Sequence, residues 1–249
     1  NTAIENKIVP EPIFYLHKIE LDNVAPKELL VVKRGKNPLE RQVTCSWEDH
    51  KKCLYYPKYE YNTTINIICT QKQKLDYYDA QIDYYKYLVK KFSNNWHSFK
   101  LNKLGLDRKN YLASLKTHYV EDFLKKFNKR YICFCNDINQ LNTLGKPEFS
   151  AHSKKAANEQ VVENFNNGVI DKLFVVKMMQ EGQNLNNIEA SVIVQLDSTS
   201  RSMIQKSGRA LRAIETPEIH IFYVAGTSDE TYLQTSIADI NKEFIKVYN

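Results

Sequence analysis

Four residues near the C-terminal end of the chain have the types and spacing suited to binding a phosphate group. Gln205, Gly208, Arg209 and Arg212 stand at relative positions 0, 3, 4 and 7, and this spacing places them on one face of a helix. Guanidinium groups suit phosphate oxygens and the charge that develops on them in a transition state. Two arginines on one helix face can equally belong to a salt-bridged surface, so the spacing alone leaves both interpretations open.

The elements that must position these residues alternate between strands and helices. Short, nearly continuous apolar segments predict strands at 130–135, 172–177, 191–196 and 219–224, with a further short strand at 148–152. Strands that are apolar on both faces and separated by helices indicate a parallel α/β sheet. Helices are predicted from Asn136-Asp137 to Leu144, over 154–165 with a close at Asn166-Asn167-Gly168, near 200–212, and over 229–247.

Two regions with other predicted secondary structure precede this one. Strands are predicted at 13–21, 28–33, 41–47 and 64–69, separated by turn-prone residues. Apolar residues then recur at helical spacing over 71–92 and again over about 107–127, with breaks at Ser93-Asn94-Asn95 and Gly105. We therefore expect a strand-rich lead-in over 1–70, an antiparallel helical pair inserted over 71–128, and an α/β domain over 129–249.

The motifs resemble those of superfamily 2 helicases and translocases. Glu181-Gly182-Gln183-Asn184, a following strand and Gln205-x-x-Gly208-Arg209-x-x-Arg212 resemble motifs V and VI. Upstream, the segment 130–137 resembles the motif IV strand, and 149–153 with its helix resembles the next segment, so the resemblance covers about Lys129 to the C-terminus in the correct order. More weakly, the segment 65–77 resembles the entry into the second motor domain of Swi/Snf-type translocases.

This resemblance implies a second, RecA-like motor domain that works on ATP and Mg²⁺ held between two domains. By position, Arg212 matches the arginine finger, and Arg209 and Gln205 match its phosphate-sensing partners. The residues Gly182, Asn184 and Gly208 match positions near the nucleotide, although the family often has Asp where Asn184 stands. The resemblance places Asn136, Ser153, Met179 and Gln180 where such a domain meets the backbone of DNA or RNA.

The other half of such a motor is missing from the sequence. No two of the 7 glycines are five residues apart with a following Lys, so there is no GxxxxGK[ST] phosphate loop. The only Asp-Glu dipeptide, Asp229-Glu230, stands at a predicted helix start, where it is expected to be a helix N-terminal charge pair instead of a metal site. We expect this chain to be inactive alone and to depend on an N-terminal RecA-like domain of the same parent chain.

Composition limits the remaining function classes. The formal net charge of +6 favours an anionic partner, although a solvated lysine-rich surface accounts for it equally well. No apolar run approaches a membrane span, and no signal peptide is visible. The 5 cysteines lack CxxC spacing, which favours a reducing cytoplasm, and Cys45, His50 and Cys53 make a poor zinc site because a structural zinc needs four ligands. We expect no metal site, and the missing initiator Met predicts a fragment.

Two alternatives to the motor half stay open. A RecA-like nucleic-acid-binding or scaffold module without ATPase activity would explain the fold, but it would not require the set Gln205, Arg209 and Arg212. A generic doubly wound enzyme would need a Gly-rich turn between a strand and a helix, and the sequence has none. The upstream sequence would decide, because a phosphate loop and a DExx box there would establish the motor.

Overall fold

The computed structural model describes residues 12–35, 38–54, 61–151, 155–176, 185, 187–196 and 216–248. The chain divides into two compact units, in which unit 1 combines residues 1–20 with 110–249 and unit 2 comprises residues 21–109. This division differs from the sequence-based boundaries of 1–70, 71–128 and 129–249. The difference arises because the first strand joins the sheet of unit 1, whereas the later N-terminal strands share unit 2 with most of the helical pair.

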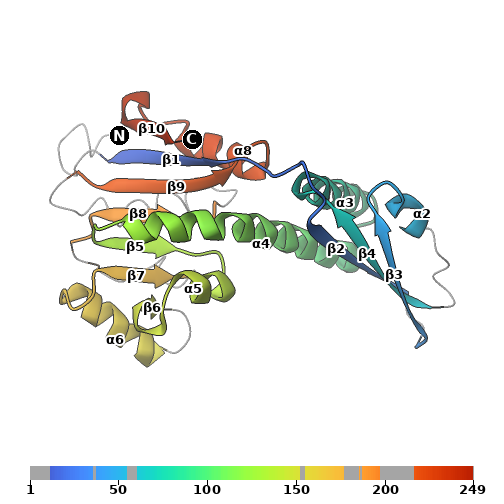
Figure 1. The fold of residues 1–249 in the computed structure, drawn as a ribbon, viewed down its shortest axis with the longest axis horizontal. Helices are drawn as coiled ribbons and strands as arrows, with labels where there is room; N and C mark the ends of the chain where they lie inside the picture. The colour runs from blue at the N-terminus through green and yellow to red at the C-terminus, as the bar shows by residue number, and fades with distance from the viewer. Residues whose placement is uncertain are drawn as a thin grey trace. The chain divides into compact units, whose positions relative to one another are not determined.

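Unit 1 is built on a seven-stranded sheet in the order β10-β1-β9-β8-β5-β7-β6, and all of its neighbouring strands run parallel (Figure 1). The predicted parallel α/β sheet flanked by helices is confirmed. Its strands are β1 (Ile13–Ile19), β5 (Tyr131–Phe134), β6 (Ser150–Ala151), β7 (Lys172–Val175), β8 (Ala190–Ile193), β9 (Glu218–Val224) and β10 (Ile245–Tyr248).

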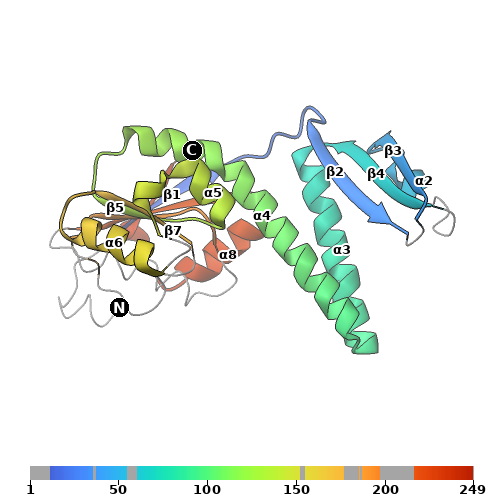
Figure 2. The same cartoon turned by 90° about the horizontal axis from the view of Figure 1, so that it is seen from below.

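Alternate residues of the central strands supply two separate cores, one on each face of the sheet. In β5, Ile132 and Phe134 face the helices α6 (Lys155–Asn166) and α8 (Ser228–Ile237), whereas Tyr131 and Cys133 face α4 (Asn95–Lys126) and α5 (Ile138–Leu144) (Figure 2). The period of two follows from the pleat of a strand. Because both faces are covered, the strands are apolar throughout, and this is the pattern from which they were predicted.

The first and last strands depart from the sequence-based expectation. β1 was expected to belong to a lead-in, but it lies between β9 and β10, with Phe14 opposite both Ile219 and Ile245. The helix predicted over 229–247 ends at Ile237, and the chain continues through a 3₁₀ turn, Lys242–Phe244, into β10. The β-branched residues of β10 gain strand pairing with β1 that a longer α8 would forgo.

The helices begin and end where local capping allows. Asp137 caps α5 by accepting a hydrogen bond from the Gln140 backbone N–H, and Gly168, at φ 73°, follows the end of α6 as expected. β6 follows a 3₁₀ turn, Pro147–Phe149, and is shorter than predicted. The expected break at Gly105 is wrong, because α4 runs through this residue. A single glycine lowers helix propensity by only about 1 kcal/mol, which the long helix α4 tolerates.

Unit 2 contains a smaller sheet in the order β2-β4-β3, with β4 antiparallel to β2 and parallel to β3. Its elements are β2 (Glu28–Arg34), β3 (Glu40–Ser46), α2 (His50–Leu54), β4 (Asn62–Cys69) and α3 (Gln71–Phe92), followed by the first part of α4. Ile65 and Ile67 are fully buried and form the centre of its core. The expected antiparallel helical pair is present as α3 and α4, joined by Ser93 and Asn94.

Candidate functional site

The strands of unit 1 all end at the same edge of the sheet, which we call the carboxyl edge. Two segments singled out by sequence follow strands that end at this edge: β7 ends at Val175, shortly before residues 177–184 in the chain, and β8 ends at Ile193, shortly before residues 197–215. Ligands of open parallel sheets bind outside the carboxyl ends of the strands. The carboxyl edge is therefore the candidate functional site.

Most of the predicted site residues lie outside the part of the chain that the structure describes. Their assignments remain predictions, and the flanking residues fix only where their segments leave the sheet. These residues are Ser153, Met179, Gln180, Gly182, Asn184, Gln205, Gly208, Arg209 and Arg212.

Asn136, the one predicted site residue within the described ranges, follows β5 at the carboxyl edge. Its side chain is buried, with 9% of its surface exposed, and its Nδ2 donates hydrogen bonds to Asn110 Oδ1 at 2.8 Å and Asp137 Oδ2 at 2.7 Å. These contacts connect the end of β5 to α4 and to the cap of α5. A contact with nucleic acid stays a prediction for this residue, whose amide protons already have partners inside the protein.

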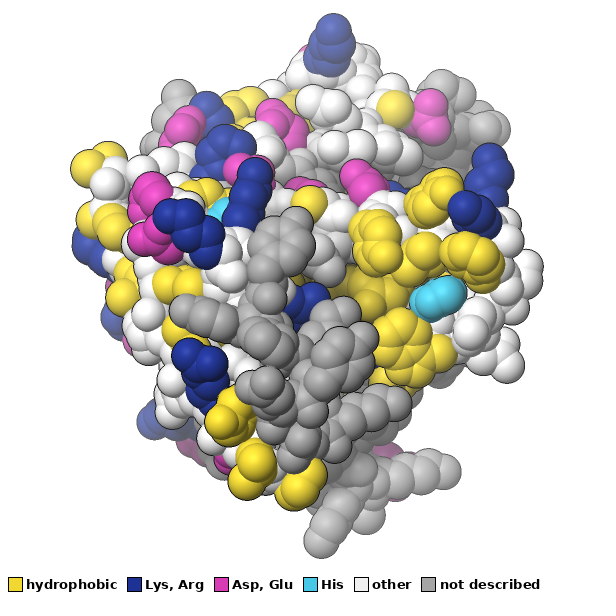
Figure 3. Space-filling view, turned by 90° about the vertical axis from the view of Figure 1, so that its right-hand side faces the viewer, with side chains coloured by type: hydrophobic (Ala, Val, Ile, Leu, Met, Phe, Trp, Pro, Cys, Tyr) yellow, Lys and Arg dark blue, Asp and Glu magenta, His cyan; other side chains and the backbone are white. Residues whose placement is uncertain are grey.

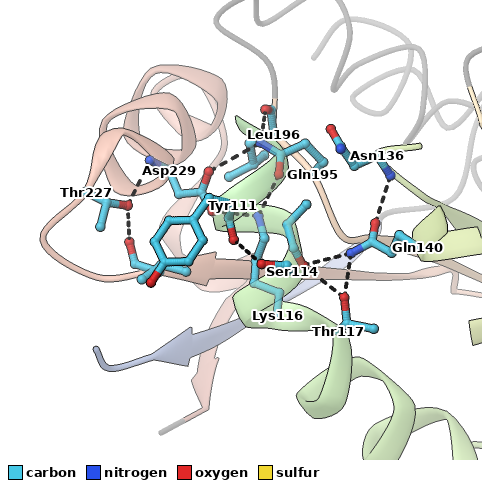
Figure 4. Close-up of polar contacts among 12 residues, drawn as sticks. Tyr111, Ser114, Lys116, Thr117, Asn136, Gln140, Gln195, Leu196, Thr227 and Asp229 are labelled. Carbon is cyan, nitrogen blue, oxygen red and sulfur yellow. Dashed lines mark hydrogen bonds and ion pairs between the residues drawn. The ribbon is translucent and has the colours of Figure 1, made fainter. Parts of the chain in front are cut away.

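Gln140 continues this connection between β5 and α4. Its Oε1 accepts a hydrogen bond from the Asn136 backbone N–H at 2.8 Å, and its Nε2 donates to the Ala113 carbonyl at 2.9 Å and to Thr117 Oγ1 at 3.1 Å (Figure 4). A buried amide with partners for both of its ends fixes the elements that it joins. The loop after β5 is therefore held in one position at the carboxyl edge.

A second polar cluster, the buried triad of Lys116, Gln195 and Asp229, lies at the end of β8. Lys116 Nζ lies 2.6 Å from Asp229 Oδ2 and donates a 3.1 Å hydrogen bond to Gln195 Oε1, and Lys116 and Asp229 have no exposed side-chain surface (Figure 4). Gln195 Nε2 donates to the Leu196 carbonyl at 2.8 Å. The triad thus ties α4 and α8 to the residue after which the chain enters the segment 197–215.

Asp229 has a role that the sequence did not reveal. The sequence predicts a charge pair of Asp229 and Glu230 at the start of a helix, and α8 does start there, capped by Thr227, whose Oγ1 accepts from the Asp229 backbone N–H at 3.2 Å. However, the Asp229 side chain is directed into the protein towards Lys116, while Glu230 accepts a hydrogen bond from the Gly226 backbone N–H at 2.8 Å. The sequence separation of 113 residues between Lys116 and Asp229 leaves no local signal for this pair.

Within the described ranges, the buried polar contacts at the carboxyl edge position the loops that follow β5 and β8. Within the described ranges, no group of three or more His, Cys, Asp and Glu residues is arranged to hold a metal ion. The Lys116 ammonium and the Asp229 carboxylate are bound to one another and shielded from water. Buried, mutually satisfied charges of this kind hold neighbouring groups in place and do not transfer protons to a substrate.

Two histidines, the half-buried His17 and the buried His220, lie on the neighbouring strands β1 and β9. His17 Nε2 and His220 Nδ1 are 3.0 Å apart, and His220 Nε2 lies 3.2 Å from Glu218 Oε2. Burial lowers the pKa of His17 to about 4, with a further contribution from His220, and burial lowers the pKa of His220 to about 4 despite the nearby Glu218 carboxylate. Both imidazoles are therefore neutral at pH 7.

Part of the chain matches a known domain family. Residues 115–214 match the helicase conserved C-terminal domain. The match begins within α4, covers β5 to β8, and includes both Lys116 and the segments 177–184 and 197–214 that follow β7 and β8 in the chain. No curated protein matches the chain by sequence.

Several solved structures are similar to part of the chain. The C-terminal domain of the DEAD-box protein Dbp5 is 14% identical, with a TM-score of 0.47 over 54% of this chain and 83% of that one. The E. coli DEAD-box protein SrmB, in its structure with RraA, is 15% identical, with a TM-score of 0.46 over 55% and 85%. The Pyrococcus furiosus Hef helicase domain is 16% identical, with a TM-score of 0.36 over 66% of this chain and 38% of that one.

Proposed function

We propose that this chain, which contains a RecA-like C-terminal domain of the superfamily 2 helicase type, is the C-terminal half of an ATP-dependent motor that moves on nucleic acid. The supporting observation is the position of the segment 197–215. This segment falls within the match to the helicase C-terminal domain, follows β8 at the carboxyl edge of a parallel sheet, and contains the Gln205-x-x-Gly208-Arg209-x-x-Arg212 motif.

In this proposal the chain supplies cations and not the nucleotide cradle. Arg212 approaches the γ-phosphate of ATP, and Arg209 and Gln205 orient the phosphate oxygens. Gly182, Asn184 and Gly208 contact the nucleotide, while Asn136, Ser153, Met179 and Gln180 contact the nucleic-acid backbone. The sequence lacks a phosphate-loop lysine, so the proposal assigns the phosphate cradle and the Mg²⁺ ligands to an N-terminal RecA-like domain of the same parent chain.

The triad and the Asn136–Gln140 connection have a positioning role in this mechanism. An arginine finger contributes only when its guanidinium reaches the transferred phosphate in the correct geometry. The triad holds Leu196, after which the segment 197–215 begins, and therefore limits the positions that the arginines of this segment can take.

We place the motor in the cytoplasm, where free cysteines stay reduced. The free cysteines are Cys45, Cys53, Cys69, Cys133 and Cys135. Within the described ranges, no helix is long and apolar enough to span a lipid bilayer.

The arginine assignment is tested by ATP turnover in two settings. The purified chain alone, with Mg²⁺ and single-stranded DNA or RNA, should hydrolyse ATP no faster than a buffer control. In a polypeptide extended upstream to include the preceding domain, Arg212→Ala should lower nucleic-acid-stimulated turnover by about 10³-fold or more, the scale of arginine fingers.

Lys206→Ala in the same extended polypeptide is the matched control, since it removes a cation from the same segment outside the 205/208/209/212 face. It should leave turnover within a few fold of the unsubstituted protein. Robust turnover by the chain alone, or near-normal turnover after Arg212→Ala, would refute the proposal and favour a binding or scaffold module.

A further inference from the structure

The end of the α3–α4 pair has a composition unlike the rest of the molecule. We call residues 84–106 the hairpin tip. Over these residues there are lysines but no Asp or Glu, and aromatic residues recur throughout. The lysines are Lys86, Lys90, Lys91, Lys100 and Lys103, and the aromatic residues are Tyr84, Tyr85, Tyr87, Phe92, Trp96 and Phe99.

Most of these rings are exposed instead of packed into a core. Trp96 is 53% exposed, Phe92 56% and Phe99 63%, and Tyr84 and Tyr87 are exposed to a similar degree. Single exposed apolar side chains are ordinary, but a group of them on one surface marks an interaction site. In Figure 3, hydrophobic side chains gather around a histidine on the right of the view, with Lys or Arg side chains at their border.

The rings come from both helices and form one connected cluster. The Trp96 ring centroid lies 6.0 Å from that of Tyr85 and 5.5 Å from that of His97, and the His97 ring lies 6.1 Å from that of Phe92. The connection is fixed by Asn94, whose Oδ1 accepts from the Trp96 backbone N–H at 2.8 Å. The tip is therefore a defined surface of planar rings.

Lysine ammonium groups lie over some of these rings. Lys91 Nζ is 5.2 Å from the centroid of Phe92, and Lys100 Nζ is 5.4 Å from that of Trp96. Lys86 pairs with Asp83 at 2.9 Å, but no residue of the described ranges forms an ion pair with Lys90, Lys91, Lys100 or Lys103. The tip thus combines exposed rings with lysines that have no acidic partner within the described ranges, and two of these lysines lie over ring faces.

We propose that the hairpin tip binds a single strand of nucleic acid, with bases stacked on its exposed rings and phosphates beside its lysines. Alternating cations and aromatic rings suit this ligand, because every base has a face that stacks and every nucleotide carries a negative charge. A second copy of the chain would bring five lysines against five lysines, which disfavours self-association through the tip. A duplex keeps its bases stacked internally and offers the rings only its ends.

This binding surface lies in unit 2 and does not require ATP or the arginines of the motor. The experiment measures it without nucleotide, by fluorescence anisotropy of labelled dT20 and rU20 with the full chain at several salt concentrations. Trp96→Ala with Phe99→Ala should weaken binding by about 10-fold or more, the scale of losing one or two stacked bases, and leave the salt dependence unchanged.

Replacement of Lys90, Lys91, Lys100 and Lys103 by Gln should also weaken binding and reduce its salt dependence, by up to about 0.7 per lysine in log–log slope. The matched control replaces four exposed lysines of the same unit, Lys27, Lys51, Lys52 and Lys72, by Gln and should change affinity less than threefold. A Trp47→Phe background leaves Trp96 as the only tryptophan. Its emission should be quenched by dT20.

Several outcomes would overturn the proposal. Any of three results would show that the tip is not the binding surface. They are unchanged affinity in the ring variant, equal losses of affinity in the two lysine variants, and Trp96 emission that does not change when dT20 is added. Preference for a blunt duplex would replace the single strand as ligand, and a dimer abolished by Trp96→Leu would replace it by a second copy. Arg212→Ala should leave this binding intact, so the motor and the tip can fail independently.

Discussion

The two units use lysine in opposite ways. In unit 1, Lys116 is fully buried and bound to Asp229 and Gln195, so its charge serves the interior of the protein. In unit 2, Lys90 and Lys91 are exposed at the hairpin tip beside open rings, so their charge is available to a partner. The same residue type thus holds one unit together and equips the other for binding. Only the location of its partners in space separates the two roles.

The strongest test of this contrast removes the buried charge. Lys116→Met leaves Asp229 buried without its cation, and the expected loss is about 3–5 kcal/mol in the free energy of unfolding. Lys125→Met is the matched control on the same helix, because Lys125 forms solvent-exposed ion pairs with Glu121 and Asp122. This substitution should leave the unfolding midpoint nearly unchanged. Urea unfolding followed by circular dichroism measures both variants.

A double variant sharpens the interpretation of this result. Lys116→Met with Asp229→Leu removes both charges and should recover much of the lost stability, since an apolar pair of similar volume avoids a buried unpaired carboxylate. A single Lys116→Met variant that unfolds within about 1 kcal/mol of the unsubstituted protein would show that the triad does not hold unit 1 together.

How far the sequence specified the molecule is clearest in unit 1. The apolar segment at 130–135 predicts a buried strand, and β5 lies inside the sheet between β8 and β7, where its side chains alternate between two covered faces. By contrast, β1 carries the same apolar signal, yet its place between β9 and β10 depends on pairing with residues about two hundred positions away. Local sequence patterns predict whether a segment forms a strand more directly than they predict which strands it will pair with.

The same limit applies to the candidate site. The motif residues could be proposed because their spacing is local, and their roles stay predictions, whereas the position of Asn136 after a strand follows from the pattern around it. The triad could not be found, since Lys116 stands among polar and apolar residues typical of any amphipathic helix and meets Asp229 only in the folded chain. Long-range pairing of buried charges leaves no mark in local spacing.

A second, smaller expected effect is the dependence of the stability of unit 1 on pH. The lowered pKa values of His17 and His220 mean that the unfolded chain binds protons more readily than the folded one. Stability is therefore full above about pH 6.5 and falls as the pH drops from 6.5 towards 4, on the order of 3 kcal/mol for one histidine. Glu218 and Lys129, with Tyr15 and Tyr248, are the other titratable groups around this pair.

Replacement by phenylalanine gives the control for this pH effect. His17→Phe keeps a ring against Phe222 but removes one titrating group, so its stability should depend less on pH between 6.5 and 5. Unfolding midpoints measured at half-unit pH steps provide the comparison. An unaltered pH profile in this variant would contradict the assignment of the acid sensitivity to the pair of His17 and His220.

The smallest predicted effect concerns unit 2. Thr70 caps α3 through its side chain, because Thr70 Oγ1 accepts a hydrogen bond from the Gln73 backbone N–H. In turn, Gln73 Oε1 accepts a hydrogen bond from the Thr70 backbone N–H. Thr70→Ala should lower the stability of unit 2 by about 1 kcal/mol. Both tryptophans, Trp47 and Trp96, belong to unit 2, so their fluorescence during unfolding reports on it.

The control is Thr143→Ala, which removes an exposed hydroxyl that bonds within helix α5 of unit 1 and caps nothing. It should not move the tryptophan transition. A shift of equal size in both variants would mean that the two units unfold as one, and the contrast between them would then be one of surface chemistry alone.

The pairing of β1 with β9 and β10 also determines how late in synthesis the sheet of unit 1 can form. β1 leaves the ribosome among the first elements of this chain, but its partners Ile219 and Ile245 are more than two hundred residues later than Phe14. At a synthesis rate of roughly 5–20 residues per second, this strand waits roughly 10–40 s with an apolar edge unpaired. Unit 2, whose strands and helices are contiguous in the chain, can fold during that interval, whereas β1 can complete its pairing only after β9 and β10 have been synthesised.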